Sequence, residues 1–469
     1  MIRRLIGLLV VAIAAIGTLY FAAGRSTPPT VVIEKPDRFV GQQGTIEVSV
    51  QGPPPATLVI TLQQDGRSLP LFTLDARQSA TVSTDASGNG LRVVRPFGKQ
   101  GVPALQQGGA RIVVEAARPS FLSLRTLSSS ATKEFQVRLD PPRIAAVSTH
   151  HYINHGGAEM VVYRVTPPGV TSGVRVGELE YPGYPAAGAG VTSADPSLKV
   201  AFFALLHDQP LPVLISLFAR DEAGNEAAAS FVNDEFEKPF RRSRIELDDG
   251  FMQRVVPEII SHSPELKLGP TESGSSATGA LLLPAFLRIN GELRQVNTKR
   301  IAELTGPTAP TRLWNGPFVQ LGSSQVEAGF ADQRTYVYQG KEVDHQVHLG
   351  FDLAVTAAVA VVAANAGNVL NASWLGIYGN CVIIDHGLGV ASLYGHLSSI
   401  DVKVGDSVTR GQTIGRSGMT GLAGGDHLHF TMLVNGRPVN PVEWWDSHWI
   451  EDRIERKLRE AGGTSTTTP

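Results

Sequence analysis

Alternating apolar and polar residues predict β-strands in the N-terminal part of the chain. Successive side chains of a strand point to opposite faces, so a period of two indicates half-buried strands. Turn-forming residues such as Gly52-Pro53-Pro54-Pro55 separate the runs. The clearest runs are Ile46, Val48 and Val50; Leu58, Ile60 and Leu62; and Phe135, Val137 and Leu139. This spacing predicts an immunoglobulin-like β-sandwich module over residues 31–140.

A second β-sandwich module is predicted over residues 141–232. Asp140-Pro141-Pro142 marks its start, and its clearest strand runs from Leu214 to Asp221. The polar turn Glu222-Ala223-Gly224-Asn225 follows directly. The two modules show no close internal repeat, so each is predicted from its own pattern.

Residues 233–304 change to a mixed pattern. A helical stripe is predicted between Asp249 and Ile260, although Pro257 counts against an unbroken helix. A Gly/Ser/Pro/Thr loop from Gly269 to Ala277 follows, and Thr298 to Leu304 fits a short helix. We interpret this segment as a connector that packs against the next domain and borders its cleft.

The two ends of the chain carry different signals. The uncharged run from Leu5 to Ala23 nearly spans a bilayer core of about 30 Å at about 1.5 Å per residue. Arg3-Arg4 places the N-terminus in the cytoplasm. Residues 1–24 therefore predict an inner-membrane anchor, with a cleaved signal peptide as the alternative. At the other end, residues 446–469 predict an amphipathic helix through Ile450, Ile454 and Leu458, then a disordered tail from Gly462.

Composition narrows the function classes. A length of 469 residues allows about three domains. The net charge of −2 offers no basic field for nucleic acid, which is excluded as a partner. The single cysteine, Cys381, permits no intrachain disulfide and stands in an apolar run that indicates core packing.

The residues that carry chemistry lie between His348 and His429. His348 and Asp352 are four residues apart, so they share a face of either a strand or a helix. His427 and His429 share one face of a strand. Imidazole and carboxylate are the ligands that zinc prefers, and a catalytic zinc typically keeps three protein ligands and one open position.

Three ordered motifs resemble those of the lysostaphin/LytM-type zinc metallopeptidases, which cut peptide cross-links of bacterial cell walls. The motifs are His348-Leu349-Gly350-Phe351-Asp352, Tyr394-Gly395-His396-Leu397 and His427-Leu428-His429-Phe430. The resemblance covers roughly residues 310–445. One departure is Ala331, where the family usually has glycine after the phenylalanine of an upstream motif; we expect this change to alter the cleft rim and to touch no ligand.

The resemblance implies a role for each motif residue. His348, Asp352 and His429 correspond to the Zn²⁺ ligands, and His396 and His427 to the catalytic pair beside the metal. It also implies a small antiparallel β domain with the cleft across its sheet. A neutral imidazole near the metal can take a proton from water, and an imidazolium can stabilise an oxyanion or protonate the leaving amine.

The other candidate residues are expected mainly to have structural roles. His386 is expected at a turn or rim, and His345 in a solvated loop. His150, His151 and His155 are expected as loop histidines, with a surface metal site as the minor alternative. Arg334 is expected either to contact a substrate carboxylate from the cleft wall or to form a structural ion pair. Trp444 and Trp445 are expected to pack at a domain edge.

The sequence therefore predicts a mainly β protein with a membrane segment, two β-sandwich modules, a connector and a peptidase domain over residues 305–445. The predicted function is a zinc-dependent endopeptidase of peptidoglycan, attached to the inner membrane with its bulk in the periplasm. Predicted partners are peptidoglycan peptide stems, with cell-wall or division proteins as candidates. The alternative is a non-catalytic regulator that activates other wall hydrolases, as relatives that have lost ligands do. Whether the set of zinc ligands is complete distinguishes the enzyme from the regulator.

Overall fold

The computed structural model describes residues 2–24, 27–52, 55–74, 83–84, 90–120, 125–193, 195–266, 279–354 and 356–462. The chain forms two compact units. One comprises Met1–Pro142 with Arg220–Ala227, and the other Arg143–Ala219 with Ala228–Pro469. The predicted loop from Gly269 to Ala277 and the tail after Gly462 lie outside the described residues.

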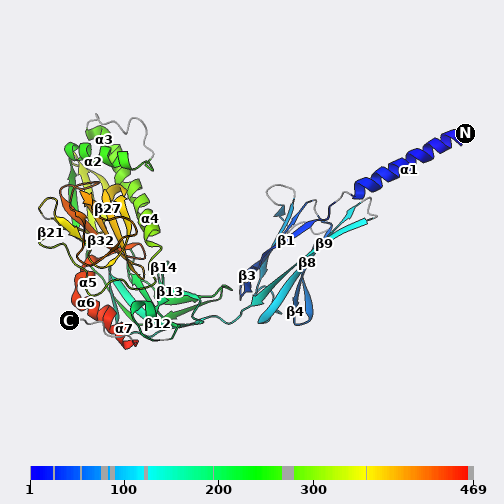
Figure 1. Cartoon of the computed structure of the whole chain (residues 1–469), viewed down its shortest axis with the longest axis horizontal. Coiled ribbons are helices and arrows are strands. Elements are labelled where there is room, and N and C mark those ends of the chain that lie inside the picture. The colour runs from blue at the N-terminus through cyan, green and yellow to red at the C-terminus, as the bar shows by residue number, and fades with distance from the viewer. Residues whose placement is uncertain are drawn as a thin grey trace. The chain divides into compact units, whose positions relative to one another are not determined.

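The N-terminal apolar run forms one helix, α1 (Ile2–Gly24), drawn in blue in Figure 1. In the part of the chain that the structure describes, no helix has the length and apolar character needed to cross a membrane. Attachment to the inner membrane stays a prediction from the sequence.

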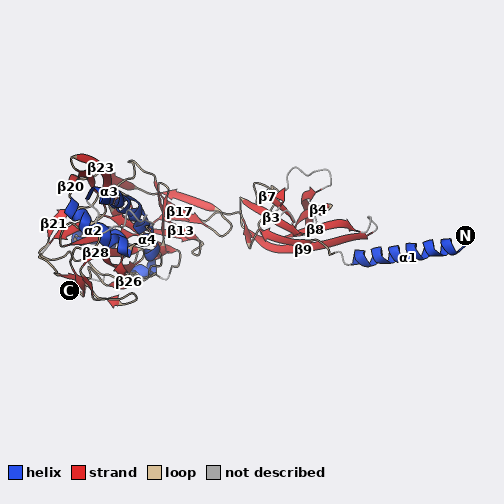
Figure 2. Cartoon of the chain, turned by 90° about the horizontal axis from the view of Figure 1, so that it is seen from above, coloured by secondary structure: helices blue, strands red, loops and turns tan. Residues whose placement is uncertain are grey.

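Two sheets form the first unit. One has the order β1 (Thr30–Lys35), β3 (Gly44–Gln51), β7 (Gly90–Phe97), β6 (Ser83–Thr84). The other has the order β2 (Phe39–Val40), β9 (Arg125–Val137), β8 (Gly108–Ser120), β4 (Thr57–Gln64), β5 (Arg67–Leu74). The long β8–β9 pair is plain in Figure 2.

One apolar core joins the two sheets of this unit. Val48 of β3, Leu58 of β4 and Ile112 of β8 are all fully buried in it. The predicted runs are confirmed as strands β3, β4 and β9, and Leu139 packs against the core just after β9. The period-two pattern predicts these strands correctly because each strand turns one face to the shared core. The immunoglobulin-like assignment remains a prediction.

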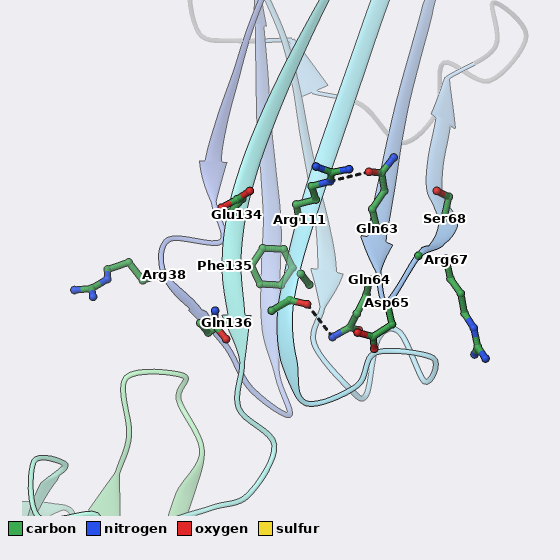
Figure 3. Close-up of a pocket in the computed structure, with 13 residues that line it drawn as sticks. Arg38, Gln63, Gln64, Asp65, Arg67, Ser68, Arg111, Glu134, Phe135 and Gln136 are labelled. Atoms are coloured by element: carbon green, nitrogen blue, oxygen red, sulfur yellow. Dashed lines mark hydrogen bonds between the residues drawn. The ribbon is translucent and has the colours of Figure 1, made fainter.

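A polar groove of about 720 Å³ lies on this unit beside the β4–β5 turn (Figure 3). Arg111 Nε donates to Gln63 Oε1 at 2.8 Å, and Gln64 Nε2 donates to the carbonyl oxygen of Gln106 at 2.7 Å. Arg38 and Glu134 also line it. The groove carries both signs of charge, so its chemistry does not select a class of ligand.

The second unit begins with three small sheets. The first has the order β10 (Arg143–Ala146), β12 (Ala158–Thr166), β16 (Leu198–Ala204), β15 (Tyr184–Pro185). The second has the order β14 (Leu179–Pro182), β13 (Thr171–Val176), β17 (Ile215–Arg220), β18 (Glu226–Ser230). The third pairs β11 (His151–Asn154) with β19 (Asn233–Phe236), and a short 3-10 helix spans Ala186–Ala189. The strand predicted around Leu214 is thus confirmed as β17.

The connector contributes one strand and a group of helices. These are β20 (Arg242–Leu247), α2 (Asp249–His262), α3 (Gly279–Arg288), a π-helical turn at Ile289–Leu293, and α4 (Arg294–Thr305). Pro257 does not break α2, contrary to the doubt raised by the sequence. Asp248 caps the helix by accepting from Phe251 N at 2.8 Å, and Val255, Val256 and Ile259 are fully buried. This burial outweighs the one hydrogen bond that proline removes.

The largest sheet, of eight strands, forms the C-terminal domain. Its order is β21 (Gln325–Ala328), β24 (Phe351–Ala354), β32 (His427–Val434), β28 (Val390–Leu397), β27 (Asn380–Gly387), β26 (Gly367–Trp374), β30 (Ser407–Val408), with β33 (Arg437–Val439) on β32. All its strand pairs are antiparallel. Two three-stranded sheets accompany it: β20, β22 (Asp332–Tyr338), β23 (Lys341–His348); and β25 (Ala360–Val362), β31 (Thr413–Arg416), β29 (Ser399–Ile400).

Short helical segments close the described chain. They are α5 (Pro441–Trp445), α6 (Ser447–Ile450), a π-helical turn at Glu451–Glu455 and α7 (Arg456–Glu460); the short 3-10 helix η3 (Gly376–Tyr378) lies earlier, between β26 and β27. The predicted amphipathic stripe is buried at Ile450, Ile454 and Leu458, although a π turn interrupts the single helix that we expected. Lys457 Nζ donates to the buried Glu159 of β12 at 2.7 Å. The C-terminal segment is therefore docked onto the second β module.

Candidate metal and catalytic site

Four strands bring the five motif residues together: β24, β32 and β28 are neighbours in the eight-stranded sheet, and β23 belongs to the sheet of β20 and β22. His348 ends β23, Asp352 lies in β24, and His427 and His429 lie in β32. Asp352 pairs with His429 across the β24–β32 ladder, and His429 pairs with Gly395, next to His396, across the β28–β32 ladder. All five side chains are buried, between 5% and 8% exposed. Residues far apart in sequence thus meet because their strands are adjacent.

Three of these side chains converge on one point. His348 Nε2 lies 2.9 Å from Asp352 Oδ1, and His429 Nδ1 lies 3.0 Å from the same oxygen. The two nitrogens are 3.0 Å apart. Within the described part of the chain, His348, Asp352 and His429 form a group whose ligand atoms can hold a metal ion.

Hydrogen bonds on the far side of each ring fix its tautomer. His348 Nδ1 faces the carbonyl oxygen of Gly329 at 3.0 Å and must therefore carry the proton. His429 Nε2 faces Thr431 Oγ1 at 3.0 Å, and that hydroxyl donates to the carbonyl oxygen of Leu349 at 2.8 Å. The hydroxyl can then only accept from His429. Such partners are typical of metal-bound histidines.

When both rings are neutral, as metal ligands must be, these tautomers direct two nitrogen lone pairs at a carboxylate oxygen. Electron-rich atoms about 3 Å apart in a buried site repel unless a cation lies among them. Two imidazoles and one carboxylate match the ligand set of a catalytic zinc, with a fourth position left for water or substrate. The residues present therefore fit Zn²⁺.

The outer oxygen of Asp352 is held by Arg334. Arg334 Nη2 donates to Asp352 Oδ2 at 2.9 Å, and Arg334 Nε lies 3.6 Å from Asp332 Oδ2. Ser243 of β20 donates to Asp332 at 2.7 Å. Burial raises the pKa of the Asp352 carboxyl, but the charge and hydrogen bonds of the surrounding histidines outweigh it and hold that pKa well below its usual range. Asp352 is thus ionised. Of the two roles considered for Arg334, the structure has the ion pair.

His396 and His427 lie beside the metal group. Their ring centroids are 4.8 Å apart, and the ring of His396 is 5.8 Å from that of His429. His396 Nδ1 donates to the carbonyl oxygen of Thr420 at 2.8 Å, and His427 Nδ1 donates to that of Gly425 at 2.9 Å. In both rings these backbone contacts occupy Nδ1 and leave Nε2 as the second polar atom; that of His427 faces Asp352 Oδ1.

The two rings differ in basicity. Burial, together with the nearby His427 and His429, holds the pKa of His396 well below its ordinary value. Burial lowers the pKa of His427. The Asp352 carboxylate, whose Oδ1 is 3.4 Å from His427 Nε2, raises that pKa by more than burial lowers it, so the net shift is upward. A neutral ring therefore lies beside one that protonates more easily, which is the arrangement that a base and an acid require.

Backbone geometry explains two positions in the motifs. A Cβ at Gly350 would lie 2.5 Å from His429 Nε2 and 2.6 Å from Thr431 Oγ1, so only glycine fits there. Ala331 has φ 60°, a conformation that favours glycine, and its N–H donates to the carbonyl oxygen of His348 at 2.7 Å. Ala331 is fully buried and bonds the backbone of His348, which corrects the expectation that the change alters the cleft rim and touches no ligand.

His386 does not lie at a turn or rim, contrary to the expectation. It is fully buried in β27, where Nδ1 faces the carbonyl oxygen of Ala366 and Nε2 faces Ser392 Oγ, each at 2.7 Å. Burial lowers the pKa of His386 to about 4. Strand β27 runs through the Asp-His-Gly sequence that resembled a turn.

The remaining candidates lie away from the metal group. His345 is exposed on strand β23 rather than in a loop. His151 is buried in β11, where its ring bonds Ser148 Oγ at 2.9 Å, so it is not a loop histidine. Cys381 is fully buried, as expected for a core residue, and Trp444 is fully buried as well.

A cavity of about 570 Å³ adjoins the site. Its lining includes Asp352 and Arg334, together with Ser243, Phe251 and Arg254 of the connector. The connector therefore borders the space next to the candidate metal ligands. Sequence reasoning missed Thr431 and Arg254. Thr431 had a signal, because it stands two residues after His429 on the same face of β32.

Residues 346–441 match the model of Peptidase family M23. The chain is 43% identical over 96 residues to Peptidoglycan DD-endopeptidase ShyA of Vibrio cholerae. This alignment covers 20% of this chain and 22% of that relative. It is 41% identical over 97 residues to DD-carboxypeptidase/endopeptidase Mpg of Neisseria meningitidis serogroup B, covering 21% and 22%. The catalytic domain of lysostaphin from Staphylococcus simulans is similar at 29% identity over 26% of this chain and 92% of that one, with a TM-score of 0.23.

The matched residues contain all five side chains of the site. The chain spans only 22% of the length of each of these two curated relatives, so the likeness concerns the C-terminal domain. The resemblance seen in the three sequence motifs is confirmed. The match to the model of Peptidase family M23 therefore concerns the C-terminal domain, through residues 346–441.

Proposed function

We propose that the chain is a zinc-dependent endopeptidase that hydrolyses peptide cross-links of peptidoglycan. The observation that carries the proposal is the convergence of His348 Nε2, His429 Nδ1 and Asp352 Oδ1, which lie 2.9 to 3.0 Å from one another. The names of two curated relatives, Peptidoglycan DD-endopeptidase ShyA and DD-carboxypeptidase/endopeptidase Mpg, support the substrate class.

The side chains around the metal group divide the proposed chemistry. Zn²⁺ bound by His348, Asp352 and His429 would polarise the scissile carbonyl and bring the pKa of a bound water toward neutrality. His396, neutral and oriented by Thr420, offers Nε2 to accept a proton. His427, whose pKa is raised, offers a proton to the developing oxyanion or leaving amine.

The regulator alternative requires a site that cannot turn over. Loss of a ligand or of a catalytic histidine would support it. This chain keeps all five residues, buries them, and orients each ring through a partner on its far side. These features favour the enzyme.

The proposal places the enzyme in the bacterial cell envelope. Its bulk would face the periplasm, and the two upstream β modules, as immunoglobulin-like sandwiches, would act as spacers or recognition modules. Attachment through Leu5–Ala23 predicts that the chain sediments with membranes and is released by detergent rather than by salt. A mature N-terminus near Arg25, with soluble periplasmic protein, would replace the anchor by a cleaved signal.

Digestion of isolated peptidoglycan tests the proposed activity. The purified chain should release soluble fragments, stop when a chelator removes the metal, and resume when Zn²⁺ is added back. Asp352→Ala should bind little zinc and release nothing, whereas Asp401→Ala, a change to an exposed carboxylate, should behave as the parent. Activity that is indifferent to the chelator would contradict the proposal.

A further inference from the structure

One irregular loop supplies the acceptors of both proposed catalytic histidines. This segment, residues 418–425, is called the acceptor loop below. Its Thr420 carbonyl accepts from His396 Nδ1 at 2.8 Å, and its Gly425 carbonyl accepts from His427 Nδ1 at 2.9 Å. The position of this loop therefore sets the orientation of both rings.

The acceptor loop is poorly suited to hold that position by itself. It contains neither helix nor strand, and four of its residues, at positions 418, 421, 424 and 425, are glycine. Glycine loses more conformational entropy on ordering than any other residue. Such a loop needs contacts from outside to stay fixed.

Arg254 of helix α2 provides such contacts. Its Nη1 donates to the carbonyl oxygen of Met419 at 3.3 Å, and its Nη2 donates to that of Ala423 at 2.5 Å. These two carbonyls lie on either side of Thr420 and Gly421 in the loop. One guanidinium thus spans the segment that holds His396.

Helix α2 is a rigid platform for Arg254. Its buried face packs in one core with Ile377 and Tyr336, and Leu422 of the acceptor loop packs against the same core. At the end of α2, the His262 ring stacks on Trp374 of β26 with centroids 4.2 Å apart. The guanidinium is therefore presented from an element that is itself fixed to the catalytic domain.

We infer that Arg254 is a positioning residue for catalysis. It fixes the acceptor loop and, through it, the catalytic rings of His396 and His427. The inference rests on the proposed function and extends it, because Arg254 stands in the connector, outside the residues that match the family model. The connector is then a working part of the active site rather than a spacer.

The role calls for arginine. A planar guanidinium presents several donors in a fixed fork and can reach two carbonyls at once, whereas the single ammonium of lysine is a compact point charge. Arg254→Lys should therefore keep part of the effect, and Arg254→Ala should keep none. Gln253→Ala, an exposed change one residue away on the same helix, is the matched control.

Turnover of a cross-linked muropeptide dimer by zinc-loaded parent and variants tests the inference. Arg254→Ala should lower kcat by about 10–100-fold, the usual cost of removing a group that orients a reacting one. KM and zinc content should stay near those of the parent, Arg254→Lys should fall between, and Gln253→Ala should match the parent. An unchanged kcat, a loss confined to KM, or a loss of zinc that parallels the loss of activity would overturn the inference.

Hydrogen exchange supplies a readout that does not depend on turnover. Amides of residues 418–427, including Leu422 N and His427 N, which donate within the fold, should exchange at least about tenfold faster in Arg254→Ala. Unchanged exchange would overturn the inference. A parent that binds zinc and cuts no wall peptide would instead reject the proposed function, whatever the exchange shows.

Discussion

Arg334 donates to Asp352 Oδ2 at 2.9 Å and leaves Asp352 Oδ1 to face the two imidazoles. The arginine thus selects which carboxylate oxygen points toward the metal position. It also compensates the buried negative charges of Asp352 and Asp332. The pair ties strand β22, outside the residues matched to the family, to the candidate metal site.

Replacing Arg334 should weaken metal binding without abolishing it. We expect Arg334→Gln to lower zinc affinity by about 10–100-fold, because groups that orient a ligand typically contribute that much. Titration with a competing chelator measures the change. Arg244→Gln, on an exposed arginine of β20, is the control and should leave affinity unchanged. Equal affinities in the parent and Arg334→Gln would show that Asp352 does not need this partner.

Thr431 offers a test of the tautomer argument. Thr431→Val keeps the shape but removes the hydroxyl that accepts from His429 Nε2, so His429 can present the wrong nitrogen to the metal. Zinc affinity should fall about tenfold or more, whereas Thr431→Ser, which keeps the hydroxyl, should stay close to the parent. A valine variant that binds zinc as tightly as the serine variant would contradict the assigned tautomer.

His386 should make the fold sensitive to acid. Burial lowers its pKa to about 4 in the folded state, against 6.5 for an ordinary histidine. Below pH 6.5 the unfolded chain binds the proton more readily, so the stability due to neutral His386 is present above that pH. It is lost as the pH falls toward 4 and amounts to roughly 3 kcal/mol.

Denaturant unfolding of metal-free protein at several pH values checks this. His386→Gln should be less stable than the parent at neutral pH, and its stability should decline less steeply between about pH 6.5 and pH 4. His345→Gln, which alters an exposed histidine, should keep the slope of the parent. Identical slopes for the parent and His386→Gln would mean that the buried ring does not govern the response.

The sequence predicted the site better than its surroundings. Ordered motifs locate His348, Asp352, His396, His427 and His429 because a ligand set and a strand period leave a signature in the local sequence. Arg254 leaves none, because its contact with the acceptor loop exists only once α2 packs on the sheet.

The wrong predictions for His386 and Pro257 have the same origin as the failure to predict Arg254. His386 was misplaced because a local Asp-His-Gly pattern suggested a turn, whereas pairing with β28 carries β27 through it. Pro257 suggested a break that the burial of α2 overrides. In each case a tertiary contact, invisible in the local pattern, decided the outcome.

The proposed catalytic pair, His396 and His427, should separate metal binding from turnover. His396→Ala and His427→Ala should each keep near-full zinc, because three other side chains hold the metal. Each should lose about 10²–10⁴-fold in rate, the usual contribution of a proton-transfer group. Metal analysis and turnover on the same preparation decide this. A variant that loses its zinc, or that cuts at the parent rate, would show that its histidine has another role.

The most direct test of the central claim is the mass of the products formed from an isolated cross-linked muropeptide dimer. The zinc-loaded parent should convert the dimer into two monomers whose summed mass exceeds that of the dimer by one water, and a chelator should prevent it. An intact dimer after prolonged incubation, with one zinc still bound per chain, would contradict the account and leave the regulator as the function of this domain.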